Sequence, residues 1–412
     1  NNTAVGSNAL DANTTASYNT ALGYAALGAN TTGAANVAIG YGALDANATH
    51  SDNTAVGTGS LGANTATGNT AVGASSLYAN TTGTENTAVG VLALGSNTTD
   101  VGNTAIGYRA LESSNGGEYN TAVGGRCLED TTTGDKNSAL GFDALHENTT
   151  GYHNTAIGSQ ALDANTGGYD NAALGSNSLS ANTTGFKNTG IGRDALATNT
   201  TGNANTAVGH SSLLNSTTSH DNTCIGYNSG KLNNTGYANC FFGVGAGLNN
   251  TTGYNNTCYG MEAGHDLTTG HNNLFLGASA GRNNSPSGTQ TTGSDTVCLG
   301  NNDIQSLYCA DTSISSSDAR DKTDVEDFKY GLSWITELRP VTYRWDRRTW
   351  YGTEENPKGT PDGSKKRARL HIGFLAQEAI EVEKKFGYAS KKDDMLIVNQ
   401  DEDVNDPSYG MK

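Results

Sequence analysis

Two residues, Ser317 and Lys322, have the types and the spacing of a nucleophile and its general base. A serine hydroxyl attacks a carbonyl carbon efficiently only when a base accepts its proton, and a neutral lysine amine is one such base. Burial lowers the pKa of a lysine and so favours the neutral amine. By itself the pattern is weak, since Ser-Asp is also a common helix cap or turn. The position of the pair in the chain gives it more weight.

The composition of the chain changes at this pair. Before it lies a long array of short repeats rich in Gly, Asn and Thr, and after it come Trp, Arg, Lys and Pro as in an ordinary globular domain. Only 35% of the 412 residues are hydrophobic and 54 are Gly, which would suggest disorder if the apolar residues were not so regularly spaced. We therefore interpret the boundary as a built-in cleavage site.

The repeat is Asn-Thr-Ala-Val-Gly-x-x-Ala-Leu-x-x-Asn-Thr-Thr-Gly-x-x, seventeen residues long. We call each copy a rung and number its positions 1 to 17 from the leading Asn; a looser copy follows at 296–300. One step, from rung 4 to rung 5, is a residue short. The seventeen leading residues are Asn2, Asn19, Asn36, Asn53, Asn69, Asn86, Asn103, Asn120, Asn137, Asn154, Asn171, Asn188, Asn205, Asn222, Asn239, Asn256 and Asn273.

Four positions of the rung predict its structure. Position 4 is a strand-forming apolar residue, and position 5 is Gly in every copy, which a tight corner or a close backbone approach demands. The Asn at position 1 predicts a ladder of stacked amides. Position 9 is Leu as far as Leu213 and Gly from Gly230 onward. We expect a mostly β protein, a parallel β-roll or β-helix with two short strands and two turns in each rung.

A rung of this kind supplies only about two large apolar side chains, which is a thin core. We therefore expect a homotrimer in which three chains share one axis. The Asn-x-Ala-[Val/Ile]-Gly pattern of residues 1–281 resembles the head repeats of trimeric autotransporter adhesins, which form trimeric left-handed parallel β-rolls. The spacing of the repeat differs from theirs, so the pattern leaves a β-roll and a triple β-helix open.

Other features of the array have simpler interpretations. Tyr152 and Tyr169 share a position on adjacent rungs, as do Tyr237 and Tyr254; these pairs either pack on each other or stack on a sugar, and packing is favoured. The six cysteines are interpreted as small buried hydrophobic residues without disulfides, and no cofactor or metal site is expected. The formal charge of −16 argues against nucleic-acid binding, and no apolar run approaches the ~20 residues of a membrane span.

The rest of the chain divides into a junction, 282–316, and a small α/β (α+β) domain, 317–412. Thr323 and Glu326 form a capping box, and Pro340 ends the helix that they begin. The remaining predicted elements are strands over 341–345 and 370–375, a helix over 376–386 closed by Gly387, and a strand over 395–398.

Three motifs of this domain, 317–322 (Ser-Asp-Ala-Arg-Asp-Lys), 338–345 (Leu-Arg-Pro-Val-Thr-Tyr-Arg-Trp) and 372–378 (Ile-Gly-Phe-Leu-Ala-Gln-Glu), resemble the endosialidase-type intramolecular chaperone domain. That family ends phage tail spikes and tail fibres. The resemblance implies a domain that trimerises, templates the folding of the β-structure before it and then cuts itself off. It also implies a further C-terminal helix that supports the trimer, and we expect this sequence, which stops at Lys412, to lack it.

Carried onto this chain, the resemblance makes Ser317 the nucleophile, Lys322 its base and Ser316–Ser317 the scissile bond. Ser315 and Ser316 are rival nucleophiles without the family spacing to the lysine. Any enzymatic activity would be this single self-cleavage, with no external substrate. The remaining motif residues are Asp318, Arg320, Gly373, Gln377 and Glu378.

The function expected is that of a phage tail fibre or spike, which is assembled in the host cytoplasm and is part of the extracellular virion tail. Its expected partners are two further copies of the chain, other virion tail proteins and a glycan or protein receptor on the host surface. The alternatives are a bacterial trimeric surface adhesin, which needs a coiled-coil stalk and an anchor, and a polysaccharide-degrading tailspike. The last needs paired carboxylates, whereas Asp11, Asp45, Glu112 and Asp163 fall at position 10 and suit solvated turns.

Overall fold

The structure is a computed structural model that describes residues 1–304, 331–344, 362–364, 371–388, 398–400 and 409–411. The chain forms two compact units, Asn1–Tyr308 and Cys309–Lys412. Each unit has its own internal architecture and is described by itself.

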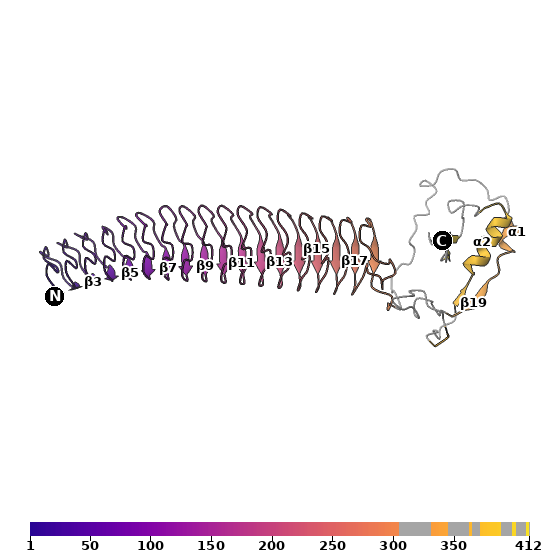
Figure 1. Cartoon of the computed structure of the whole chain (residues 1–412), viewed down its shortest axis with the longest axis horizontal. Coiled ribbons are helices and arrows are strands. Elements are labelled where there is room, and N and C mark those ends of the chain that lie inside the picture. Colours follow the sequence, from indigo (N-terminus) through magenta and orange to yellow (C-terminus); the bar gives the residue numbers. More distant parts are fainter. Residues whose placement is uncertain (305–330, 345–361, 365–370, 389–397, 401–408, 412) are drawn as a thin grey trace. The chain divides into compact units, whose positions relative to one another are not determined.

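The first unit is a β-solenoid whose rungs each contribute one short strand to a single parallel sheet (Figure 1). Strands of successive rungs pair without any shift, so that Thr155–Ile157 aligns residue for residue with Ala172–Leu174. The predicted mostly β, parallel solenoid is therefore confirmed. The eighteen strands are β1 (Thr3–Val5), β2 (Thr20–Leu22), β3 (Val37–Ile39), β4 (Thr54–Val56), β5 (Thr70–Val72), β6 (Thr87–Val89), β7 (Thr104–Ile106), β8 (Thr121–Val123), β9 (Ser138–Leu140), β10 (Thr155–Ile157), β11 (Ala172–Leu174), β12 (Thr189–Ile191), β13 (Thr206–Val208), β14 (Thr223–Ile225), β15 (Cys240–Phe242), β16 (Thr257–Tyr259), β17 (Leu274–Leu276) and β18 (Val297–Leu299).

The prediction of two strands in each rung was wrong, because backbone with positive φ follows the first strand. In rung 10, Gly158 at position 5 has φ 134°, and Gln160 and Leu162 at positions 7 and 9 have φ 57° and 53°. Asp170 at position 17 has φ 55°. Extended strands require negative φ, so these residues turn the chain and leave three residues of strand in each rung.

The Gly at position 5 is needed for both of the reasons that the sequence suggested. A Cβ atom built on Gly158 would lie 2.6 Å from the carbonyl carbon of Gly175 in the next rung. Real Cβ atoms essentially never approach backbone so closely. A positive φ near 134° is also one that residues with side chains rarely adopt. The predicted close backbone approach is confirmed.

The core of the solenoid contains one large apolar side chain in each of the earlier rungs, not two. Ala156 and Ala161, at positions 3 and 8, and Leu162, at position 9, are fully buried. Ile157, at position 4, points away from this core and is 39% exposed. Neighbouring residues of a strand point to opposite faces, so burying position 3 turns position 4 outward.

From rung 14 onward the core is built differently. Position 9 becomes Gly, while position 3 alternates between Cys and Phe instead of Ala. Phe241 lies against the glycines of its own and the preceding rung, since Cβ atoms built on Gly247 and Gly230 would lie 2.6 Å and 3.1 Å from its ring. One phenylalanine therefore fills the space that two leucines fill in earlier rungs. The alternating residues are Cys224, Phe241, Cys258, Phe275 and Cys298.

Two buried asparagine ladders satisfy the polar backbone of the turns. At position 1 the backbone N–H of Asn171 donates to Oδ1 of Asn154 at 3.1 Å, and its own Nδ2 donates to the carbonyl of Gly185 at 2.8 Å. This is the predicted amide ladder, and it is confirmed. The second ladder, at position 12, was not predicted: Nδ2 of Asn182 donates to Oδ1 of Asn165 at 2.8 Å and to Gly185 at 3.0 Å.

The described part of the second unit contains two helices and two antiparallel pairs of strands. Its helices are α1 (Gly331–Ile335) and α2 (Ala376–Lys385), and its strands are β19 (Val341–Tyr343), β20 (His371–Gly373), β21 (Val398–Gln400) and β22 (Tyr409–Met411). Strand β19 pairs with β20, and β21 pairs with β22.

The helix predicted over 376–386 is confirmed. It is followed by Gly387 with φ 86°, the left-handed conformation that commonly terminates a helix. The capping box at Thr323 and Glu326 lies outside the described residues.

Candidate functional site

The predicted nucleophile and base lie outside the described residues. The same holds for the scissile bond and for two of the motif residues, so their roles stay predictions. These residues are Ser316, Ser317, Asp318, Arg320 and Lys322.

The two other motifs of the second unit meet through strand pairing. Val341 of β19 lies opposite Gly373 of β20 in the antiparallel register. Helix α2 begins three residues after Gly373, which places Gln377 and Glu378 in its first turn. The Gln377 side chain is exposed, and that of Glu378 is half-buried.

A forked ion pair joins these motifs. Nε of Arg339 donates to Oε2 of Glu378 at 3.0 Å, and Nη2 donates to Oε1 of the same carboxylate. The hydrogen bonds to Glu378, together with its charge, raise the pKa of Arg339 above its ordinary value. Two parallel N–H···O bonds fix orientation as well as distance. Arg339 therefore links the segment before β19 to the first turn of α2.

A second ion pair, between Lys385 and Glu337, ties the last turn of α2 to the same segment. Between the two ion pairs, Ala379, Ile380 and Glu383 are buried. Residues 337–339 thus hold α2 near both of its ends. Sequence reasoning did not select Arg339, Glu337 or Lys385, although Arg339 stands inside a quoted motif next to Pro340.

On the solenoid, the aromatic residues at position 16 stack on one another. The rings of Tyr152 and Tyr169 are parallel to within 5° with centroids 5.0 Å apart, and Phe186 continues the stack. Tyr237 and Tyr254 are arranged in the same way at 4.9 Å. Each ring face shared in this way is closed to a sugar, which needs an uncovered face. The packing interpretation of these tyrosine pairs is confirmed.

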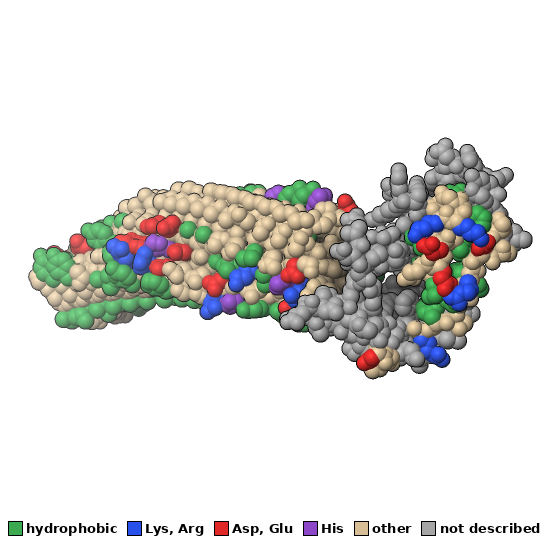
Figure 2. All heavy atoms as spheres, turned by 45° about the vertical axis from the view of Figure 1, so that its right-hand side comes forward, with side chains coloured by type: hydrophobic (Ala, Val, Ile, Leu, Met, Phe, Trp, Pro, Cys, Tyr) green, Lys and Arg blue, Asp and Glu red, His purple; other side chains and the backbone are tan. Residues whose placement is uncertain are grey.

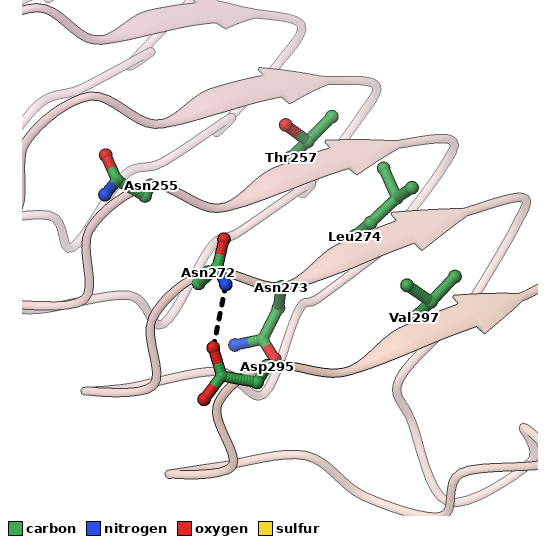
Figure 3. A pocket seen from close by; sticks show the side chains of 7 residues that line it. All are labelled: Asn255, Thr257, Asn272, Asn273, Leu274, Asp295 and Val297. Atoms are coloured by element: carbon green, nitrogen blue, oxygen red, sulfur yellow. Dashed lines mark hydrogen bonds between the residues drawn. The ribbon is translucent and has the colours of Figure 1, made fainter. Parts of the chain in front are cut away.

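The last rungs carry a shallow hollow of about 360 Å³ (Figure 3). One side is polar, and there Nδ2 of Asn272 donates to Asp295 at 2.7 Å. The other side is formed by the position 2 side chains of β16, β17 and β18. Asp295 is the one carboxylate in its lining, so this hollow does not provide the pair that glycoside hydrolysis requires. The lining residues are Asn255, Thr257, Asn272, Asn273, Leu274, Asp295 and Val297.

The carboxylates of the middle rungs are held in a network of ion pairs. Glu129, which is 7% exposed, contacts Arg109 at 2.9 Å and Arg126 at 3.0 Å. Arg126 also lies 3.4 Å from Asp143. Burial raises the pKa of Asp163, at the end of this network. Glu129 and Asp143 are thus paired with arginines across rungs.

The cysteines that the structure describes are free thiols. Cys127, Cys224, Cys258 and Cys298 are buried, and Cys240 is half-buried. Burial raises the pKa of Cys127 to about 12. At Cys298 burial is the largest influence and acts in the same direction, but hydrogen bonds with Ser287, Ser285 and nearby backbone together lower the pKa.

Among the described residues, no three His, Cys, Asp or Glu side chains are grouped so as to hold a metal ion. No helix in the described ranges has the length and apolar character of a membrane span.

Comparison with known proteins supports the resemblance for the C-terminal part of the chain. Residues 317–388 match the model of a family described as chaperone of endosialidase. Neither the curated proteins nor the solved structures gave a match to the chain. The match covers 72 residues (317 to 388 inclusive) of 412 and includes all three motifs. The chain thus joins a parallel β-solenoid to a segment similar to an intramolecular chaperone.

Proposed function

We propose that this chain is a structural fibre protein whose solenoid folds under the direction of its C-terminal segment, which then cuts itself off. The observation that carries the proposal is the match to chaperone of endosialidase, which begins at Ser317 itself. The last solenoid strand, β18, ends at Leu299, shortly before it. A folding template next to the last rung would help the repeats to pair in the correct register. In such an array, a rung that pairs out of step by one whole repeat keeps most of its contacts.

The proposed cleavage uses only residues of the junction. Oγ of Ser317 attacks the carbonyl carbon of Ser316 while Nζ of Lys322 accepts the hydroxyl proton. The amide bond breaks and its nitrogen, now the amine of Ser317, takes the proton from Lys322. This leaves an ester between Ser316 and Oγ of Ser317. Water hydrolyses the ester, which frees the carboxylate of Ser316 and restores the Ser317 hydroxyl.

The cleavage is tested on denaturing gels of the full chain, beside Ser317→Ala, Lys322→Ala and the matched control Ser315→Ala. The unchanged chain and the control are expected to give two fragments, the smaller beginning at Ser317 by N-terminal sequencing. Both dyad variants are expected to stay in one piece. An uncut band from the unchanged chain, or cleavage of Ser317→Ala at the same bond, would refute the proposed dyad.

Support for the proposed homotrimer comes from the outer face of the strands. A row of apolar side chains at position 4 follows the solenoid from its first rung to its last, and Figure 2 shows hydrophobic side chains in patches on its surface. Contiguous exposed apolar surface usually marks an interface. The most exposed members of this row are Val5, Leu22, Val72, Ile106, Leu140, Ile157, Leu174, Ile191, Tyr259, Leu276 and Leu299.

The biological role that we propose is attachment of a phage tail to a host surface through a glycan or protein receptor. In this proposal the fibre assembles in the host cytoplasm and joins other tail proteins in the virion. A bacterial adhesin and a polysaccharide-degrading tailspike remain the alternatives. The hollow of the last rungs has a single carboxylate, Asp295, which gives the degrading tailspike no support there.

A further inference from the structure

A second hollow, of about 460 Å³, opens on rungs 3 to 5 beside the turn residues that follow the strands. Its floor is the chain of rung 4, which carries only small residues there: Thr58, Gly59, Gly62 and Ala63. Tyr41 of rung 3 and Tyr78 of rung 5 stand on either side. Binding sites for small ligands commonly have about this volume and combine apolar walls with a few polar groups.

The hollow lies at the end of an aromatic stack. Tyr24 and Tyr41 occupy position 6 of rungs 2 and 3, and their rings are parallel to within 11° with centroids 5.3 Å apart. Position 6 of the next rung is Thr58, which has no ring to cover the second face of Tyr41. Successive rungs lie about 4.8 Å apart, so the absence of a ring at Thr58 leaves one face of Tyr41 open to a ring-shaped ligand. Tyr41 is 63% exposed.

The glycines of the floor place the second tyrosine. A Cβ atom built on Gly62 would lie 3.1 Å from the Tyr78 ring, and one built on Gly59 would lie 3.5 Å from it. The Tyr78 ring therefore rests directly on the backbone of rung 4. It forms a wall of the hollow and is 54% exposed.

The polar groups of the hollow are acceptors and hydroxyls. Asp45 of rung 3 is exposed and lies in the lining, as do Thr58 and Ser75. A carboxylate accepts hydrogen bonds from hydroxyl groups, whereas it repels a ligand of its own charge. The formal charge of the chain, −16, acts in the same direction.

We propose that the hollow between Tyr41 and Tyr78 binds one uncharged pyranose ring of a glycan. The C–H groups of a sugar face carry partial positive charge and are attracted to the negative face of an aromatic ring. Tyr41 provides that face, Asp45 accepts from ring hydroxyls, and acidic sugars are excluded by charge. The inference rests on the proposed attachment function for its biological role, although binding itself requires neither cleavage nor trimerisation.

The sharpest test fills the hollow beside Tyr41 without removing any tyrosine. Thr58→Tyr is expected to continue the Tyr24–Tyr41 stack and so to close the hollow while preserving the fold. Tyr41→Ala removes the stacking face instead. Tyr108→Ala removes a tyrosine of similar exposure, 54%, that also stands at position 6 but lies outside the hollow. Thermal unfolding followed by circular dichroism checks that each variant is folded.

Binding is measured by saturation-transfer NMR on the full chain. The probes are methyl pyranosides of glucose, galactose, mannose and N-acetylglucosamine, with methyl glucuronoside as the charged comparison. At least one neutral pyranoside is expected to receive saturation, with a signal at least fivefold weaker for Thr58→Tyr and Tyr41→Ala and unchanged for Tyr108→Ala. Absence of neutral binding, preference for the glucuronoside, or equal signals from all variants would overturn the inference. Cleavage at Ser316–Ser317 is scored on the same samples, so failure of either proposal is seen separately.

Discussion

At position 5 of each rung, the stack has room for the hydrogen atom of Gly but not for a Cβ atom. Gly158→Ala would place a Cβ atom 2.6 Å from Gly175 and hold alanine at φ 134°. Backbone strain of about 1–3 kcal/mol and overpacking of about 1–3 kcal/mol add up, so a loss of about 2–6 kcal/mol in the free energy of unfolding is expected. The measurement is the denaturation midpoint of the solenoid in guanidinium.

Gly167→Ala is the matched control in the same rung. Its Cβ atom would meet only the Thr150 hydroxyl, at an ordinary 3.5 Å, and Gly167 does not have positive φ. Its midpoint is expected to change little or to rise, since alanine restricts the unfolded chain. Equal losses from the two substitutions would contradict the close-approach explanation.

Two of the buried cysteines, Cys224 and Cys258, should not react with thiol reagents in the folded protein. Burial raises the pKa of Cys258 above its ordinary value of 9.0 and does the same at Cys224, and only the thiolate reacts with iodoacetamide. We expect native labelling at pH 8 to leave both unmodified, while the half-buried Cys240 reacts slowly. Because unfolding lets these thiols ionise, the stability they contribute is present below pH 9 and is lost as pH rises above it.

Peptide mass spectrometry after labelling measures the extent of modification at each cysteine. Complete labelling in guanidinium is the reference, and Cys240→Ser should abolish the native signal at that peptide alone. Rapid native labelling of Cys224 or Cys258 would show that the late rungs open readily.

At the scale of the rung, the sequence predicted how the strands of successive rungs pair, but not the path of the backbone within one rung. The strand-forming residue at position 4, the Gly at position 5 and the Asn at position 1 each have one dominant physical role, so the parallel stack and its amide ladder follow from them. The path depends on Leu162 and Gln160 taking positive φ. Propensity argues against this conformation for Leu and Gln, and the surrounding stack imposes it. The second strand was therefore predicted where a turn exists.

The late rungs test whether positions 3 and 9 share one volume. Phe241→Ala should cost about 3–5 kcal/mol through the cavity that it leaves, and Gly247→Leu should clash with the phenylalanine ring. The backbone accepts leucine here, because φ is 59° at Gly247 and 50° at Leu213. The two substitutions together restore the Ala–Leu pairing of earlier rungs. We expect the loss in free energy of unfolding of the double variant to be about 2–3 kcal/mol smaller than the sum of the losses of the two single variants.

Guanidinium midpoints of the four proteins give this coupling. The pair Phe241→Ala with Gly270→Ala is a control, because Gly270 lies at position 15 and its Cβ atom would meet Gly293, Leu267 and Asn273. Additive losses from Phe241→Ala and Gly247→Leu would contradict the shared volume. The change of residue at position 3 would then be unrelated to the change at position 9.

For the whole molecule, the sequence predicted where the candidate site lies in the chain, but not the contacts that hold its helix α2. The motifs led to the segment that matches chaperone of endosialidase at 317–388. The contacts that hold α2, from Arg339 to Glu378 and from Lys385 to Glu337, join residues 39 and 48 positions apart. Spacing that long carries no periodic signal, so pairing of this kind could not be predicted from one sequence.

The structure of the core changes the physical reason for which a trimer is expected. Each solenoid closes its own core with Ala, Leu and Asn, so a shared core is not what three chains would gain. The gain would come from covering the position 4 row, where Leu140 and Leu174 are 49% and 46% exposed. Burying such side chains contributes roughly 25 cal/mol for each Å² removed from water. In the proposed trimer this gain, repeated over the rungs, would hold parallel chains together.

Charge placed on that row should therefore separate the chains. The double variant Leu140→Lys and Leu174→Lys is expected to shift sedimentation equilibrium from three chains toward one, because buried lysines lose hydration without gaining partners. Thr150→Lys with Thr184→Lys puts the same charges on the same rungs at exposed position 14 and should leave the assembly intact. A monomeric unchanged protein would refute the trimer. Dissociation by the control pair would place the interface on another face of the solenoid.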